Sequence, residues 1–520
     1  MATEARRGIR RIAANYLRLA CLLALGLVLV PVLISWVGLE AFGLIELVGA
    51  SVGFAGTVQQ LTNQGMVRDL STAYHSGDDA IFARAYNSAY VVSAAVAVLS
   101  AVVFVILLSV IHLLRIPDEW VPAARWFIAA QGAYACLTVL GAPAFSMYRV
   151  QERFGWYAFW MVLSRATALT SALLLAFVFR VTDTAEAIRA HGLLWSGLLI
   201  GVFLASVIVA IAGDRRLIPD PRRAHAADAR AVFHTFGWNS AAHVGVSLYE
   251  RLAALLMNLA FGVFGNAVFG VAHRLVAYVR MTTTGVTFGL DSASARLSSG
   301  AQADSVRDLL RHSIRLQAFV ALPASLAVFV LAEPALRLWI GGRVANPEAV
   351  IPPAVTIVQI LIFSIASRAI ADGWTSVLFG AGHVRRYAPL VLTGGLVSPI
   401  VGGALLLLLP ESLRFQAPAI GFAVVFIIVH GLLLPAVAAR CLDTNYTAMF
   451  TPLGRPLLAL AIGAPILFAA NAMIAEWTLV HLAAVAAGYG LAFAILGWLV
   501  VMTGAERRRF GGAVRRQLAR

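Results

Sequence analysis

Residues 89–108 of the chain read AYVVSAAVAVLSAVVFVILL, a run of 20 residues without a charged side chain. An α-helix of about 20 apolar residues matches the thickness of the hydrocarbon core of a bilayer, about 30 Å. Apolar blocks of similar length follow one another along most of the 520 residues. The stretch therefore predicts one of many membrane-spanning helices.

The composition of the whole chain agrees with this interpretation. Hydrophobic residues make up 60% and charged residues 12% of the sequence, with a mean hydropathy of +0.84. A soluble protein carries roughly 25% charged and 45–50% apolar residues, so a string of soluble domains is excluded. The sequence predicts an all-α, polytopic membrane protein with 14 transmembrane helices, at residues 16–37, 42–62, 88–114, 123–147, 157–179, 191–213, 237–261, 267–290, 316–340, 354–380, 388–409, 418–439, 456–475 and 480–503.

The formal net charge of +15 indicates a nucleic-acid partner only if the charges gather on one soluble surface. All 40 basic residues are Arg, and with the N-terminus in the cytoplasm 28 of them fall in inner segments. An excess of basic residues on the inner side sets the orientation of membrane helices. We therefore expect both termini in the cytoplasm and no nucleic-acid partner; the bacterial inner-membrane location is implied by the family resemblance given below.

The polar connections are short, and this limits the functions that the chain can have. The longest, near residues 214–235, holds about 22 residues, so no soluble catalytic domain fits between the helices. Cys21, Cys136 and Cys441 lack the spacing of a metal site or a disulfide framework. We expect no enzyme, no cofactor and no metal, although a compact active site inside the membrane stays open as an alternative.

The chain contains an internal repeat at an offset of 223–233 residues. Gly38–Gly43 matches Gly265–Gly270, and Arg153-Phe154 matches Arg386-Tyr387. Two parallel repeats of six helices are typical of transporters with the substrate site between the halves. The alternative is a chance alignment of Gly- and Ala-rich stretches. The predicted division is an N-lobe at 1–213, a basic cytoplasmic linker at 214–235, a C-lobe at 236–440, two added helices at 441–503 and a basic tail at 504–520.

Polar residues form one stripe on each of two equivalent helices. A spacing of 4, 3, 4, 3, 4 places them on one helix face, and two such faces predict a wet central cavity. The alternative is that both faces are buried against neighbouring helices. The stripes are His273, Ala277, Arg280, Thr284, Thr287 and Asp291 in the eighth span, and Glu46, Ala50, Gly53, Thr57, Gln60 and Gln64 in the second.

Ionisable residues at membrane depth are functional candidates by default. Besides the stripes, the deep set holds Arg18, Arg165, Arg251, Arg274, Arg368, Glu250, Glu333 and Asp372. Arg368 and Asp372, four residues apart, are expected to pair with each other. Guanidinium groups bind phosphate oxygens bidentately, so an anionic substrate is predicted. The expected substrate site comprises Arg280, Arg251, Arg18, His273, Thr284, Thr287, Thr57 and Gln60, with ion coupling through Glu46, Glu250 or Asp291.

Several short motifs carry a family resemblance. They are Asn15-Tyr16-Leu17, Pro31 late in the first span, Val37–Leu44 with its G-x-x-x-F-G pattern, the basic loop Arg149–Phe154 and the turn Gly380–His383 before Arg385. With the length and the repeat, the chain resembles the multidrug/oligosaccharidyl-lipid/polysaccharide flippase superfamily, and within it the polysaccharide-transporter branch.

The resemblance implies two pseudo-symmetric six-helix lobes around a central cavity, plus two C-terminal helices, working by alternating access. It implies that the protein flips a polyprenyl-pyrophosphate-linked oligosaccharide for cell-surface polysaccharide biosynthesis, with glycan polymerase or glycosyltransferases as candidate partners. The alternatives are a multidrug exporter of the same superfamily, which would favour acidic residues in the cavity, a membrane enzyme of glycan assembly, and a scaffold that transports nothing.

Overall fold

The computed structural model describes residues 2–284, 290, 294, 297–298, 303–504 and 506–508, with the backbone alone at 2–16, 50–65, 68–69, 231–236, 239, 284 and 303. Within these ranges the chain is almost wholly helical and contains no strand. By its internal packing the chain divides into two compact units. Unit 1 holds residues 1–271, 343–345 and 388–422, and unit 2 holds 272–342, 346–387 and 423–520.

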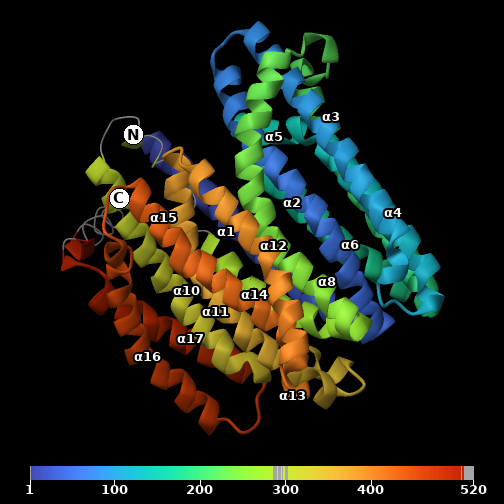
Figure 1. Cartoon of the computed structure of the whole chain (residues 1–520), viewed down its shortest axis with the longest axis vertical. Helices are drawn as coiled ribbons and strands as arrows, with labels where there is room; N and C mark the ends of the chain where they lie inside the picture. Colours follow the sequence, from blue (N-terminus) through green and yellow to red (C-terminus); the bar gives the residue numbers. More distant parts are fainter. Residues whose placement is uncertain are drawn as a thin grey trace. The chain divides into compact units, whose positions relative to one another are not determined.

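Unit 1 is built mainly from the first half of the chain (Figure 1). Within it, α1 packs on α6, α2 on α4 and α5, and α4 on both α3 and α7. Its elements are α1 (Ala2–Val37), α2 (Leu39–His75), α3 (Asp79–Ser109), α4 (Val121–Leu140), α5 (Ala142–Val150), α6 (Phe154–Leu173), α7 (Thr184–Gly213), most of α8 (Ala226–Thr284), most of α12 (Val384–Leu408), α13 (Glu411–Arg414) and the start of α14 (Ala417–Ile427).

The glycines of the first repeat motif shape the junction between α1 and α2. Gly38 separates the two helices with φ of 84°, a conformation that residues with a Cβ rarely adopt. One turn later Gly43 lies so close to α8 that a Cβ there would be 2.0 Å from the Val263 carbonyl oxygen and 2.9 Å from the Ala267 nitrogen. The second motif makes a similarly close contact. A Cβ at Gly270 would lie 2.9 Å from the Glu46 side chain. The two motifs that the sequence pairs as a repeat thus pack against each other inside unit 1.

Helix α8, 59 residues long, is broken at Gly262, where φ is 65° and ψ is −161°. A straight helix of this length would measure about 88 Å, far more than a bilayer is thick. The break falls between the seventh and eighth predicted spans. Arg115, from the connection between α3 and α4, lies beside the break: its Nη1 donates to the Ala260 carbonyl at 2.9 Å and its backbone nitrogen to Asn258 Oδ1 at 3.1 Å. These bonds satisfy groups that the end of a helix leaves without partners.

Aromatic side chains fill the core at one end of unit 1. Tyr86 stacks on Phe82 with 5.6 Å between ring centroids, and its hydroxyl donates to the Leu217 carbonyl at 2.9 Å. Tyr148 of α5 donates to the Ser206 carbonyl of α7 at 2.6 Å. These hydroxyls are buried yet bonded, which avoids the cost of an unsatisfied polar group. The connection after α7 is thereby held against α3.

Unit 2 is built from the end of α8, α10 (Ala303–Ile340), α11 (Pro347–Gly380), the end of α14, α15 (Leu434–Cys441), α16 (Gly454–Met473) and α17 (Leu479–Leu496). Helix α10 packs along α11 and also against α16 and α17. Phe319 of α10 stacks on Phe493 of α17 with ring centroids 5.3 Å apart. The two C-terminal helices, predicted as an addition to the repeat, therefore share a core with α10.

Eleven helices of the described residues are long and apolar enough to cross a membrane, or twelve if α4 and α5, bent by 52°, form one span. The fourteen predicted spans are thus not all recovered. Helix α2 is not among the eleven, because the side chains of residues 50–65 and 68–69 lie outside the described part of the chain. The two predicted spans of α8 count as one, from Ser240 to Thr283, because the break at Gly262 does not end the helix.

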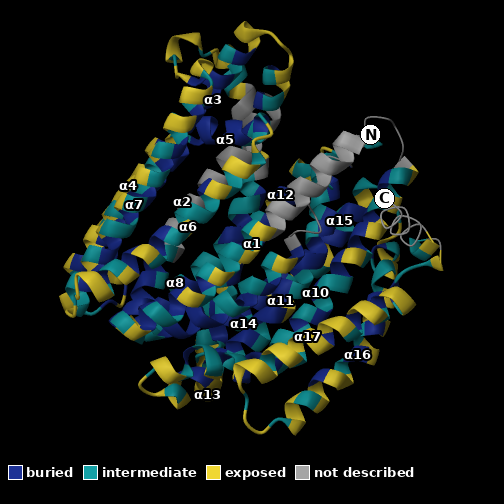
Figure 2. Cartoon of the chain, turned by 180° about the vertical axis from the view of Figure 1, so that it is seen from behind, coloured by how far each residue is buried: buried dark blue, intermediate teal, exposed yellow. Residues whose placement is uncertain are grey.

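Apolar side chains cover the outward faces of the helices. Figure 2 shows exposed residues along α16 and α17, where Val480 keeps 75% of its surface accessible. Leu407 near the end of α12 is 84% exposed. Apolar patches of this extent are rare on soluble proteins, whereas lipid chains cover them in a membrane protein. The chain is therefore a multi-pass membrane protein.

The contact at Gly43 gives a first prediction. We expect Gly43→Ala to lower the stability of the protein by about 1–3 kcal/mol, because the added methyl group overlaps the α8 backbone, which cannot move aside. The measurement is the apparent melting temperature of purified protein in detergent. Gly197→Ala in α7 is the control, since a Cβ there meets nothing within 4 Å. Equal melting temperatures of the two variants would contradict the prediction.

Candidate functional site

In unit 1 the structure brings three of the predicted ionisable residues together. Arg251 of α8 interacts electrostatically with Glu250 beside it and with Glu46 of α2. Its Nη1 also points to the Gly49 carbonyl oxygen, at a distance of 3.5 Å. Because Gly43 and Gly270 allow α2 and α8 to approach closely, this cluster joins the two repeat motifs. The local charge is one cation to two carboxylates.

Arg18 lies in the same unit but in a different environment. Its guanidinium lies over the ring of Tyr157 in α6, with 5.7 Å to the ring centroid. A guanidinium over an aromatic face gains a cation–π attraction. The structure thus gives Arg18 a packing role between α1 and α6. Its predicted contact with a substrate stays a prediction.

Unit 2 contains a second charged cluster, built around Arg368 of α11. Arg368 Nε lies 2.8 Å from Asp372 Oδ1, which confirms the pair expected from their spacing. Arg368 Nη1 lies 3.2 Å from Nε2 of His430, which follows α14 in a π-helical segment, η7 (Ile428–Leu433). Arg368 is 6% exposed and His430 is fully buried. π-Helical turns recur at functional sites, where they displace a side chain from the regular helical register.

The hydrogen bonds of His430 determine its protonation state. Its Nδ1 lies 3.2 Å from the Phe426 carbonyl oxygen, which can only accept. Its Nε2 faces the guanidinium of Arg368, which can only donate. The ring must therefore carry its proton on Nδ1 and be neutral. Arg280 of α8 also acts electrostatically on His430, so two guanidinium groups act on this ring.

The remaining predicted site residues divide between described and undescribed positions. His273, one helical turn before Ala277 on the Arg280 stripe, is half-buried in unit 2. The backbone of Thr57, Gln60 and Thr284 is helical, but their side chains lie outside the described residues, as do Thr287 and Asp291 entirely. Arg251 and Arg280 belong to different units. That they face one shared cavity remains a prediction.

One acid of the deep set forms an exposed ion pair. Glu333 is 57% exposed at its side chain and pairs with Arg337 of the next helical turn at 3.0 Å. Arg337 also pairs with Glu348 of α11 at 2.7 Å. The depth of Glu333 in the membrane stays a prediction.

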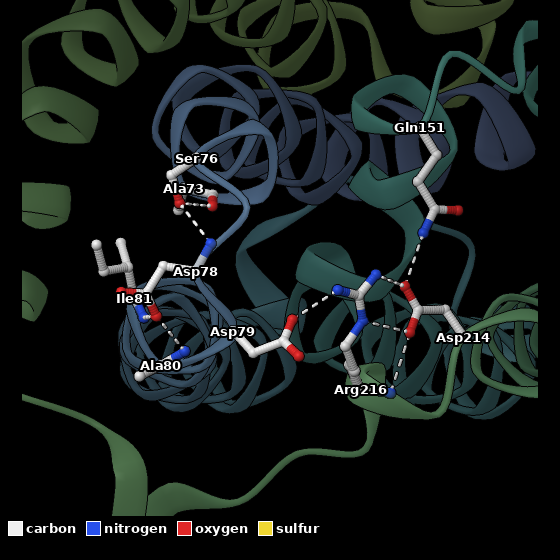
Figure 3. Close-up of polar contacts among 9 residues, drawn as sticks. All are labelled: Ala73, Ser76, Asp78, Asp79, Ala80, Ile81, Gln151, Asp214 and Arg216. Carbon is white, nitrogen blue, oxygen red and sulfur yellow. Dashed lines mark hydrogen bonds and ion pairs between the residues drawn. The ribbon is translucent and has the colours of Figure 1, made fainter.

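A separate polar network holds the connection after α7 to unit 1 (Figure 3). Arg216 donates to Asp214 through Nε at 3.0 Å and Nη2 at 2.9 Å, and to Asp79 of α3 through Nη1 at 2.8 Å. Gln151, after α5, donates to Oδ2 of Asp214 at 3.1 Å. Asn87 of α3 accepts from the Asp220 nitrogen at 2.7 Å. The first part of the predicted linker is thus fixed to α3 rather than freely suspended.

The network changes the acidity of its members. The hydrogen bonds from Arg216 lower the pKa of Asp214 below its ordinary value, against the opposing effect of burial. The same carboxylates raise the pKa of Arg216. A carboxylate whose pKa is lower in the folded state stabilises the fold above its unfolded pKa, and this contribution is lost as the pH falls through the folded pKa.

Sequence reasoning missed His430 and the Arg216 network. His430 lies in an apolar span, and an ionisable residue at such a place is itself a signal. Asp214 is two residues from Arg216, but Asp79 and Gln151 come from segments far away in the sequence, so no local spacing could have indicated the network. Arg216 does lie in the one long basic connection, which the charge pattern singles out.

Comparison with known proteins identifies the fold. No protein-family model and no curated protein matches the sequence. Among solved structures, the lipid II flippase MurJ in an inward closed conformation matches with a TM-score of 0.69 and 11% sequence identity, covering 94% of this chain and 98% of that chain. The chain therefore has a fold similar to that of MurJ.

Multidrug transporters share this fold as well. An inward-facing multidrug resistance MATE family transporter of the MOP superfamily matches with a TM-score of 0.67 and 13% identity, covering 84% of this chain and 98% of that one. The MATE transporter VcmN of Vibrio cholerae matches with a TM-score of 0.56 and 17% identity, over 85% of this chain and 100% of that one. At these identities the likeness concerns the fold.

The cluster around Arg368 gives a second prediction. We expect His430→Ala to destabilise the protein by about 1–3 kcal/mol, because it removes the buried acceptor of a charged donor. His430→Gln can keep an amide oxygen near Arg368 and should lose less. The readout is the apparent melting temperature in detergent. An equal loss in both variants would mean that packing, not the hydrogen bond, stabilises this position.

The Arg216 network gives a third prediction, which concerns pH. At pH 7 we expect Arg216→Gln to lower the stability by about 1 kcal/mol, since the network is partly exposed. Because Asp214 is charged only above its pKa, the difference between wild type and variant should shrink as the pH falls below about 4. Melting temperatures of wild type and variant, measured from about pH 3 to about pH 8, test this. Arg222→Gln, at an exposed position, is the control; a difference that does not change with pH would contradict the assignment.

Proposed function

We propose that the chain is a transporter that flips a lipid-linked, pyrophosphate-bearing oligosaccharide across a bacterial inner membrane by alternating access. The observation that supports the proposal is the pair of guanidinium groups in the helices of unit 2, where Arg280 and Arg368 both act on the buried, neutral ring of His430. A cation in an apolar environment is costly unless an anion pairs with it. Pyrophosphate supplies that anion, because its oxygens match the donor fork of a guanidinium.

In this proposal the phosphate and sugars pass along the polar stripes while the lipid tail remains in the bilayer. Arg280 is the primary phosphate ligand, with Arg251, Arg18 and His273 as further contacts and Thr57, Gln60, Thr284 and Thr287 lining the path. Glu46, Glu250 and Asp291 are the proposed coupling residues. Arg251 differs from Arg280 in lying near two carboxylates. An anion that binds Arg251 must therefore displace a carboxylate, which could then take up a proton.

The comparisons support a transporter fold and leave a multidrug exporter of the same fold as the alternative. MurJ covers 94% of the chain, and the MATE transporters cover 84–85%. We also propose fourteen crossings, with α8 crossing twice and the polar α2 crossing once, and both termini in the cytoplasm. Glycan polymerase or glycosyltransferases remain proposed partners, in cell-surface polysaccharide biosynthesis.

The proposal predicts the behaviour of reconstituted protein. Liposomes containing it should translocate a labelled polyprenyl-pyrophosphate oligosaccharide without changing its mass. We expect Arg280→Ala to slow this about 10- to 100-fold, the loss that removal of one charge-assisted binding group brings. The control is Arg414→Ala, which alters the exposed arginine at the end of α13.

Three outcomes would contradict parts of the proposal. Full activity of Arg280→Ala removes Arg280 from the substrate site. Exchange of organic cations for protons, without lipid translocation, indicates a multidrug exporter. A new glycosidic product, detected as a change in mass, indicates an enzyme of glycan assembly.

A further inference from the structure

A groove lies between α3 and α4 of unit 1. Its volume is about 590 Å³, within the range of sites that hold small molecules. Val105 and Leu108 of α3 and Ala129 of α4 form an apolar wall, and Arg125 and Trp126 of α4 stand at its edge. All these residues belong to unit 1. The groove ends where α3 and α4 touch, since a Cβ at Gly132 would be 2.8 Å from the Phe104 ring.

The position of the groove along the helices matches the edge of a bilayer. Helix α3 has 31 residues, about 46 Å, and after Arg84 it contains no charged residue up to its end at Ser109. Arg125 and Trp126 lie in the second turn of α4, about 6 Å from its start at Val121. Tryptophan is enriched where headgroups meet hydrocarbon, and arginine extends its charge toward that level. The apolar wall at Val105 and Ala129 lies deeper in the membrane.

The residues of the groove are exposed in the described part of the chain. Val105 is 61% exposed and Trp126 is 57% exposed. Arg125 is exposed too, and it forms no hydrogen bond or ion pair with any residue that the structure describes. A guanidinium at the end of an apolar groove is complementary to an anion that carries an apolar chain. A phosphate ester meets this requirement, since its oxygens accept from both arms of the guanidinium.

We propose that this groove binds a glycerophospholipid of the surrounding membrane. Arg125 holds the phosphate, Trp126 lies beside the glycerol backbone, and one acyl chain follows Val105, Leu108 and Ala129 toward Phe104. The site is separate from the proposed path of the transported lipid. It requires only that α3 and α4 span the membrane, so it does not depend on the identity of the proposed substrate. On the proposed topology the lipid belongs to the outer leaflet.

The test measures retained lipid by native mass spectrometry of the purified full-length protein. Phosphatidylglycerol, phosphatidylethanolamine and diacylglycerol are titrated separately in detergent. We expect Arg125→Gln to weaken the binding of both phosphate-bearing lipids about tenfold, the effect of one charge-assisted contact, and to leave diacylglycerol unchanged. Arg180→Gln is the matched control, because Arg180 is another exposed arginine of unit 1 that forms no ion pair with the described residues.

A second variant tests the groove itself and keeps the charge. Ala129→Trp fills the apolar wall, and we expect it to weaken all three lipids while leaving Arg125 in place. Inorganic phosphate competing equally with the phospholipids would show that the chain is not recognised and would overturn the proposal. So would equal lipid binding by wild type, Arg125→Gln and Arg180→Gln. The flipping activity of Arg125→Gln, measured in the same liposome assay, should remain that of wild type.

Discussion

A charge inside a membrane-spanning helix needs a partner, and this constraint organises the interior of the protein. Lipid chains cannot solvate a guanidinium, so each buried arginine must find carboxylates, carbonyls, ring nitrogens or aromatic faces within the protein. Arg368 meets Asp372 and His430, Arg251 interacts with Glu46 and Glu250, and Arg18 lies over Tyr157. These pairs join helices that are distant in sequence.

The partners are not equivalent, and the difference separates structural arginines from candidate binding groups. Arg251 interacts with two carboxylates, Glu46 and Glu250, whereas Arg368 and Arg280 both act on His430. The His430 ring adds no charge of its own, because its hydrogen bonds require it to donate at Nδ1 and accept at Nε2.

Glycine provides the second condition, because charged partners meet only if their helices approach closely. Gly43 lets α2 contact the α8 backbone at Val263, and Gly270 accommodates Glu46. A larger side chain at either place would separate the helices that carry Glu46 and Arg251. The same glycines were visible in the sequence as the two halves of a repeat. Their physical meaning, a contact between the copies, emerged only when the helices were placed.

The sequence by itself determined the helical membrane fold, since apolar runs of bilayer length leave no other structure that satisfies the backbone. It also determined the pair of Arg368 and Asp372, because a spacing of four residues fixes neighbours on one helix. Only the tertiary structure decided that α8 breaks at Gly262 without ending, that the Glu333 side chain is exposed, and that His430 and Asp79 join charged networks. Those outcomes depend on contacts between distant segments, which local periodicity does not encode.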